Sequence, residues 1–130
     1  MWKVRLVRFI HVVSIWLFWP ALLLIAWGEL TPQAITPEIF FGMDKLEHFT
    51  AYFGLAAMAC LALGFQRKLA WSVLGIIALS AVLEVIQDYV GRDPEALDFI
   101  ANAVGALSGL GAGVLFLWLL DPLVGMARTE

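Results

Sequence analysis

Charge and cysteine are both scarce in this chain of 130 residues. Lys, Arg, Asp and Glu make up 15% of it, against about a quarter in soluble domains. The single cysteine, Cys60, cannot form an internal disulfide, and we expect it to fill space within a helix. The chain also lacks a Gly-rich phosphate loop, a cysteine-based metal motif and a basic stripe that would bind nucleic acid. We therefore expect no nucleic-acid partner.

Hydrophobic residues, by contrast, make up 62% of the chain and fall into long apolar runs. A bilayer core about 30 Å thick needs roughly 20 helical residues, and each run is long enough. The sequence therefore predicts an all-α membrane protein with a single domain over residues 1–130. Its four transmembrane helices are predicted over about residues 6–28, 46–65, 69–90 and 97–120.

The distribution of basic residues predicts how the spans are oriented. Residues 1–8 carry three Lys or Arg residues and the 66–68 loop carries two, whereas the 29–45 and 91–96 segments carry one each. The positive-inside rule then places both termini and the 66–68 loop in the cytoplasm, in a multi-pass protein of the cytoplasmic (inner) membrane. The first run is too long for a signal peptide and no Ala-x-Ala-type cleavage site follows it, so we interpret it as a helix.

Prolines mark further expected features of the spans. We expect Pro20 to kink the first helix, and Asp121 with Pro122 to end the fourth. The acidic connection of residues 29–43 would lie outside the membrane, and whether it covers a site as a lid is left open.

Polar side chains recur at helical spacing on three of the predicted spans, always toward the outward side. They are Asp44, His48 and Tyr52 on the second span, Glu84, Gln87 and Asp88 on the third, and Asp98 and Asn102 on the fourth. Spacings of three or four residues keep each group on one helix face. An acidic side chain at the bilayer centre costs about 2.5–3.5 kcal/mol, so we expect these faces to meet in one polar site in the outer leaflet, with Arg92 at its corner.

Each residue of this site has a functional and a structural interpretation. His48 and Glu84 are the tentative catalytic residues, because they could transfer protons. Lys45 and Arg92 could hold an anionic head group. The ligand-binding candidates are Asp44, Lys45, Tyr52, Gln87, Arg92, Asp98 and Asn102. The alternative is a set of hydrogen bonds and ion pairs that locks the helices together. A metal site of His48, Glu84 and Asp98 is disfavoured because it has one histidine and no cysteine, and no cofactor is predicted.

A ladder of glycines continues the polar face of the fourth span at Gly105, Gly109 and Gly113. Small residues four apart allow a neighbouring helix to approach closely. We expect this face to pack against another helix of the chain, and a homo-oligomer contact is the alternative.

The order of these residues resembles that of the VanZ-like family of small bacterial membrane proteins. The matching motifs are Asp44-Lys45-x-x-His48-x-x-x-Tyr52, Glu84-x-x-Gln87, Gly91-Arg92 and Asp98-x-x-x-Asn102-x-x-Gly105, followed by Gly109. The resemblance implies a short multi-helix membrane domain, and the founding member of the family is an accessory factor in resistance to the glycopeptide antibiotic teicoplanin. One departure is the segment after Arg92, which reads Asp-Pro-Glu-Ala-Leu where a small hydroxyl residue would be expected.

Two functions follow as expectations. The first is a site that binds or acts on an anionic lipid or a lipid-linked cell-envelope intermediate. The second is a non-catalytic accessory protein that affects glycopeptide susceptibility, in which the polar residues are a structural lock. A small oligomeric transporter is a third alternative, but four spans leave little room for a pore.

Overall fold

The computed structural model describes residues 2–32, 37 and 39–125, and over these residues it is helical without strands. Its four helices are α1 (Trp2–Leu30), α2 (Met43–Leu63), α3 (Arg67–Tyr89) and α4 (Ala96–Gly125). Within the described residues, each helix is long and apolar enough to cross a membrane, judged by length and composition. The fold is therefore that of a multi-pass, four-helix membrane protein, as the apolar runs predicted.

The helix ends differ from the predicted ones in ways that matter for the site. α1 continues to Leu30, so Glu29 lies inside the helix and not in the connection that follows it. α4 continues to Gly125, so the prediction that Asp121 and Pro122 end it is wrong. Membrane helices tolerate proline because local adjustments and neighbouring groups satisfy the freed backbone groups. Pro20 likewise lies inside α1, which runs on for ten residues beyond it.

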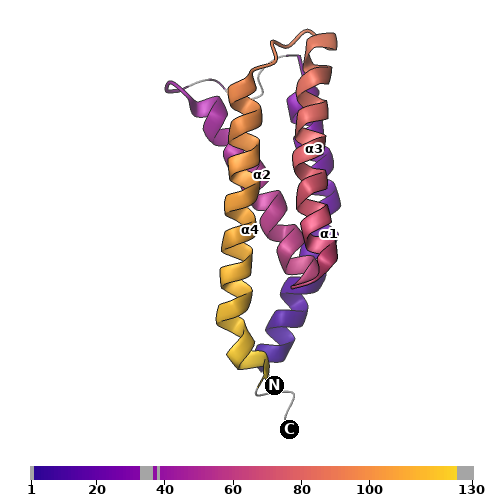
Figure 1. Ribbon diagram of the computed structural model, residues 1–130, viewed down its shortest axis with the longest axis vertical. Coiled ribbons are helices and arrows are strands. Elements are labelled where there is room, and N and C mark those ends of the chain that lie inside the picture. The colour runs from indigo at the N-terminus through magenta and orange to yellow at the C-terminus, as the bar shows by residue number, and fades with distance from the viewer. Residues whose placement is uncertain (1, 33–36, 38, 126–130) are drawn as a thin grey trace.

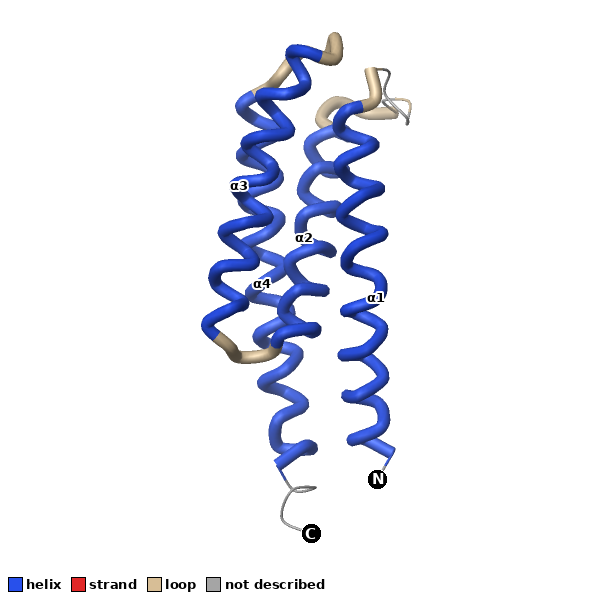
Figure 2. Tube along the Cα trace, turned by 90° about the vertical axis from the view of Figure 1, so that its right-hand side faces the viewer, coloured by secondary structure: helices blue, strands red, loops and turns tan. Residues whose placement is uncertain are grey.

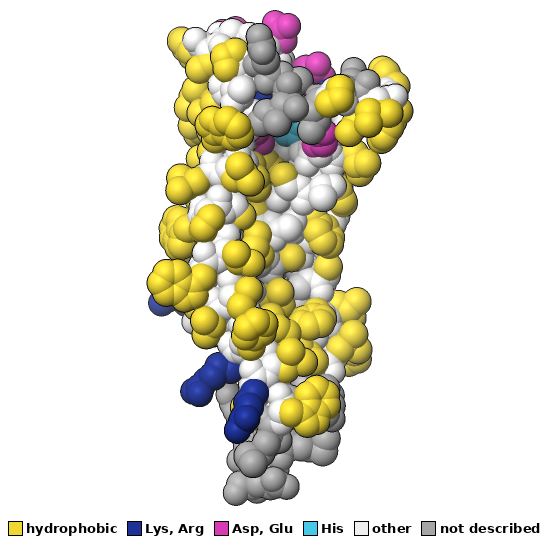
Figure 3. Space-filling model, turned by 180° about the vertical axis from the view of Figure 1, so that it is seen from behind, with side chains coloured by type: hydrophobic (Ala, Val, Ile, Leu, Met, Phe, Trp, Pro, Cys, Tyr) yellow, Lys and Arg dark blue, Asp and Glu magenta, His cyan; other side chains and the backbone are white. Residues whose placement is uncertain are grey.

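The helices lie roughly along one axis and give the molecule two distinct ends (Figure 1 and Figure 2). The end of α1, the start of α2 and the turn of residues 90–95 lie at one end, called here the connector end. The start of α1 and the end of α4 lie at the other, the terminal end. On the face seen in Figure 3, Asp and Glu side chains gather at the connector end, and most of the visible Lys and Arg side chains lie toward the terminal end. Which end faces the cytoplasm stays a prediction.

The tightest helix pair is α2 with α4, and the glycines of α4 make it possible. A Cβ atom on Gly105 would lie 2.3 Å from the carbonyl oxygen of Phe49, and one on Gly109 would lie 2.1 Å from that of Phe53. A Cβ on Gly113 would lie 2.7 Å from Cβ of Cys60. The glycine face therefore packs against α2 of the same chain. The alternative of a homo-oligomer contact stays a prediction.

The hydrophobic core is small, and many large apolar side chains lie exposed on the surface of the helices. The core is centred on Leu55, Ala56, Cys60 and Ala106, which are fully buried where α2 meets α4. Large side chains of α1, such as Trp16 and Leu23, are exposed. A continuous exposed apolar surface of this kind is typical of a protein surrounded by lipid.

Candidate functional site

The turn after α3 is shaped by Gly91 and directs Arg92 back toward α1. Gly91 has φ of +81°, a left-handed conformation that glycine adopts without strain. The N–H of Arg92 donates to the carbonyl oxygen of Gln87 at 2.9 Å, which is the bond that closes a Schellman motif at the end of α3. The Gly91-Arg92 pair thus ends one helix and aims the guanidinium at another.

Arg92 and Gln87 together cap the last turn of α1. Nη1 of Arg92 donates to the carbonyl oxygens of Gly28 at 3.0 Å and Glu29 at 3.2 Å, and Nε2 of Gln87 donates to that of Glu29 at 3.2 Å. These carbonyls have no partner within their own helix, and a cation is favourable at a helix C-terminus. Both residues hold the end of α1 in this structure, and their predicted role in ligand binding stays a prediction.

The side chain of Glu29 lies inside the polar site, although the sequence placed it in an external connection. It is only 6% exposed. Its Oε2 accepts a hydrogen bond of 3.2 Å from the hydroxyl of Tyr52, and its Oε1 lies 3.4 Å from Nδ1 of His48. The one signal available in the sequence was that Glu29 directly follows the predicted end of the first span. All four helices therefore contribute polar side chains to the site, whereas the sequence predicted such side chains on three of them.

A buried chain of hydrogen bonds connects α2, α4 and α3. Oδ1 of Asn102 lies 3.0 Å from Nδ1 of His48, and Nδ2 of Asn102 donates to the hydroxyl of Ser80 at 2.8 Å. Because the amide donates to Ser80, its oxygen faces His48, so Nδ1 of His48 is the donor in that bond. Nε2 of His48 lies 3.6 Å from Oδ2 of Asp98. Both ring nitrogens of His48 therefore face oxygen atoms of neighbouring helices.

Ser80 was not predicted as a site residue. It is fully buried, and its hydroxyl accepts the hydrogen bond from Asn102. It lies four residues before Glu84, on the same face of α3. That spacing was the available signal, but a lone serine in an apolar run is easily interpreted as a packing residue.

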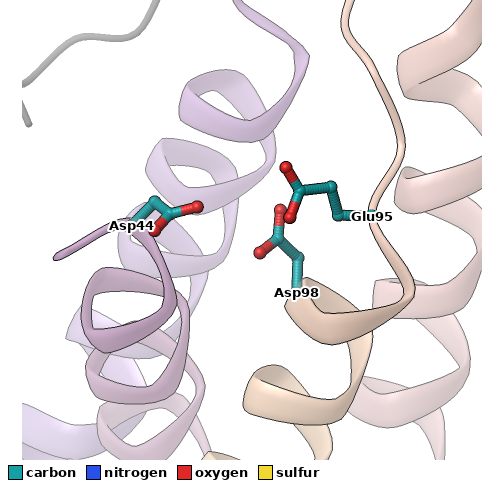
Figure 4. A group of neighbouring side chains, drawn as sticks. All are labelled: Asp44, Glu95 and Asp98. Atoms are coloured by element: carbon teal, nitrogen blue, oxygen red, sulfur yellow. The ribbon is translucent and has the colours of Figure 1, made fainter. Parts of the chain in front are cut away.

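The mouth of the site holds three carboxylates around one ammonium group. Asp44 from α2, Glu95 from the turn and Asp98 from α4 point toward a common centre (Figure 4), and their nearest oxygens lie within 4.8 Å of one another. Nζ of Lys45 lies 2.6 Å from Asp44 and 2.7 Å from Asp98, and it also pairs with Glu95. Carboxylates at this spacing could hold a divalent cation, but the ammonium of Lys45 lies in that position.

Glu84 is a buried carboxylate whose two oxygen atoms differ in their partners. Its Oε1 accepts a hydrogen bond of 2.5 Å from the backbone N–H of Glu95. Its Oε2 is buried and has no hydrogen-bond donor among the described residues. Oε1 of Glu29 and Oδ1 of Asp98 are also buried without a hydrogen bond, but each faces a basic side chain. The site thus contains carboxylate acceptors that the described chain does not fully use.

The predicted site residues converge at the connector end. The structure places there Asp44, Lys45, His48, Tyr52, Glu84, Gln87, Arg92, Asp98 and Asn102. Asp88, predicted on the same helix face as Glu84, is instead exposed and lies outside this set. Glu29, Ser80 and Glu95 join the set without having been predicted.

The balance of charge in the site is acidic. Its carboxylates are those of Glu29, Asp44, Glu84, Glu95 and Asp98. The basic groups facing them are Lys45 and His48, since Arg92 is directed to backbone carbonyls. A ligand that brings hydrogen-bond donors therefore matches the buried carboxylates of the site, and a phosphate matches only the neighbourhood of Lys45 and His48.

Fold and site together define a class, a four-helix membrane protein with a buried polar layer at one end. No family model matches the chain, and neither curated proteins nor solved structures give a match. The resemblance to the VanZ-like family accordingly depends on the spacing of the residues described above.

Proposed function

We propose that this protein is a VanZ-like protein of the cytoplasmic membrane and that its polar layer binds the head group of a lipid-linked cell-envelope intermediate. The observation that carries the proposal is Oε2 of Glu84, a buried carboxylate oxygen without a donor among the described residues. Such an oxygen costs about 1–3 kcal/mol or more when it is left unpaired. A ligand that donates a hydrogen bond to it would recover that free energy.

The two parts of the site suit the two parts of such a head group. Sugar hydroxyls and amide N–H groups would donate to the deep carboxylates of Glu84 and Glu29. An anionic phosphate would lie at the mouth, where the Lys45 side chain is 26% exposed and can exchange a carboxylate for a phosphate oxygen. An anionic lipid without a sugar would use only this outer part.

The orientation in this proposal follows from the positive-inside rule. The basic residues of the terminal end would face the cytoplasm, and the connector end would face the outer leaflet. Lipid-linked envelope intermediates that have crossed the membrane present their head groups on that side.

Any chemical step at the site would use His48 and Glu84 for proton transfer. His48 has acceptors on both ring nitrogens and can release a proton, and Glu84 has a free oxygen that can take one up. Lys45 would stabilise negative charge that develops on the ligand.

Glu84→Gln tests the proposal, and Asp88→Asn is its matched control. Both changes remove one negative charge from α3, but Asp88 is exposed and lies outside the site. Purified protein of each variant would be analysed by native mass spectrometry for bound lipid-linked intermediates. We expect Glu84→Gln to lose the ligand and Asp88→Asn to keep it. Equal retention in both folded variants would contradict the proposal.

A second function has its own supporting observation: Arg92 and Asn102 form hydrogen bonds with groups of the protein itself. In this alternative the layer is a structural lock, and the protein affects glycopeptide susceptibility without binding a ligand there. Cells that carry Glu84→Gln would then keep the wild-type susceptibility to teicoplanin, whereas Asn102→Ala would lower both the amount of folded protein and the effect.

A further inference from the structure

A groove lies near the terminal end, away from the polar layer. Its volume is about 350 Å³, within the range of about 300–1,000 Å³ typical of small-molecule sites. Three helices contribute apolar side chains to it, and they include Val7, Ile10, Leu61, Leu63, Leu117 and Leu120. It is separate from every residue of the proposed head-group site.

The lengths of the helices explain why the groove exists. α2 ends at Leu63, and Gly64, with φ of +63°, turns the chain into α3. α1 and α4 extend further toward the terminal end than this turn does (Figure 1). Beyond Leu63 the space between α1 and α4 is therefore not filled by α2.

Two polar side chains line the otherwise apolar groove, and both come from α1. Arg8 and His11 lie three residues apart, on one face of the helix, and both are exposed. Arg5, Arg67 and Lys68 are further exposed basic residues of α1 and of the start of α3. No Asp or Glu is among the described residues that line the groove, although Asp121 directly follows the lining residue Leu120 in α4. A negatively charged group in the groove would therefore lie beside Arg8 and His11 without a carboxylate among the described lining side chains.

We propose that this groove binds one acyl chain of an anionic phospholipid, with the lipid phosphate held by Arg8 and His11. The apolar walls match the chain, and Arg8 can bind the phosphate through two hydrogen bonds. Basic side chains at the membrane surface attract anionic lipids. All the basic side chains of the terminal end attract anionic lipids. The groove would give one of these lipids a defined binding site.

The test compares lipid retention in the full-length protein. Wild type, the double variant Arg8→Gln/His11→Gln and the control Arg67→Gln would be reconstituted with phosphatidylglycerol or phosphatidylcholine and analysed by native mass spectrometry. Arg67 is an exposed basic residue that does not line the groove. We expect wild type to retain phosphatidylglycerol over phosphatidylcholine, the double variant to retain it at least tenfold less, and the control to change less than twofold.

A second variant tests the groove itself. Leu117→Trp would fill it, and Leu115→Trp, on the exposed face of the same helix, is the matched control. Only Leu117→Trp should reduce phosphatidylglycerol retention. The proposal is overturned if wild type does not distinguish the two lipids, or if Arg67→Gln has as large an effect as the double variant. It is also overturned if a second copy of the chain occupies the groove, in which case Leu117→Trp would disrupt a dimer. Glu84→Gln should leave this lipid bound, which separates this site from the head-group site.

Discussion

The hydroxyl of Tyr52 on α2 donates a hydrogen bond of 3.2 Å to Oε2 of Glu29 on α1. The two residues are 23 positions apart, and both are buried. This bond attaches the first helix to the polar layer, because Glu29 is the one acidic residue that α1 carries. Most other side chains of α1 are exposed or partly exposed, so we expect these polar contacts to help hold its end in place.

A double-mutant cycle on this pair measures its contribution. Tyr52→Phe removes the donor and Glu29→Gln removes the negative charge of the acceptor, while both keep the side-chain volume close to the original. We expect each change to lower the free energy of unfolding in detergent by about 1–3 kcal/mol, as for hydrogen bonds to charged groups. The coupling energy should be about 0.5–2 kcal/mol. A coupling energy of zero would show that the bond does not hold α1 in place.

Arg92→Ala should destabilise the protein by leaving carbonyl oxygens of the last turn of α1 without their donor. The expected loss is about 1–3 kcal/mol, measured by unfolding in detergent. Arg67→Ala, which removes an exposed arginine at the opposite end, is the control and should change stability by less than about 0.5 kcal/mol. If Arg92 contributes to ligand binding and not to stability, Arg92→Ala and Arg67→Ala will have similar free energies of unfolding.

Gly109→Ala should separate α2 from α4, whereas Gly111→Ala on the same helix should not. A Cβ at Gly109 would lie 2.1 Å from the backbone oxygen of Phe53, and a Cβ at Gly111 has no heavy atom within 4 Å. Backbone cannot move aside as the end of a flexible side chain can, so we expect Gly109→Ala to cost about 1–3 kcal/mol. Thermal unfolding of the two variants in the same detergent checks this, and similar melting temperatures would contradict it.

Lys45→Met should destabilise the protein more at neutral than at acidic pH. The change leaves Asp44, Glu95 and Asp98 facing one another without the ammonium between them. Because the Lys45 side chain is 26% exposed, we expect a loss of about 1–3 kcal/mol, below the about 3–5 kcal/mol of a fully buried pair. Protonation of the carboxylates relieves their repulsion, so the loss should shrink as the pH falls. Lys68→Met, an exposed lysine of the terminal end, should show no such pH dependence.

Local spacing explains why much of the polar layer could be predicted. Asp44, His48 and Tyr52 are four residues apart, and a helix places such residues on one face whatever surrounds it. Asp98 and Asn102 follow the same rule. The cost of placing charges in lipid then required these faces to turn inward, and the structure brings them together at the connector end.

Partners could not be predicted in the same way, because they depend on contacts between helices. The hydrogen bonds of Arg92 to the carbonyls at the end of α1 were not predicted, and its expected role in holding an anionic head group stays a prediction. Glu29 was placed one residue beyond a predicted span, and helix ends are the least certain feature of a hydropathy pattern. Ser80 is recognised as a site residue only from its hydrogen bond to Asn102, which the sequence does not reveal.

The sequence by itself determined that the chain is a four-helix membrane protein with a polar face on three of its helices, because hydropathy and helical period are local properties. Only the tertiary structure decided that α1 closes the polar layer through Glu29, that Lys45 lies among three carboxylates, and that the glycines of α4 pack against α2. These are distances between residues far apart in the chain, and they are set by how the helices cross and where each one ends.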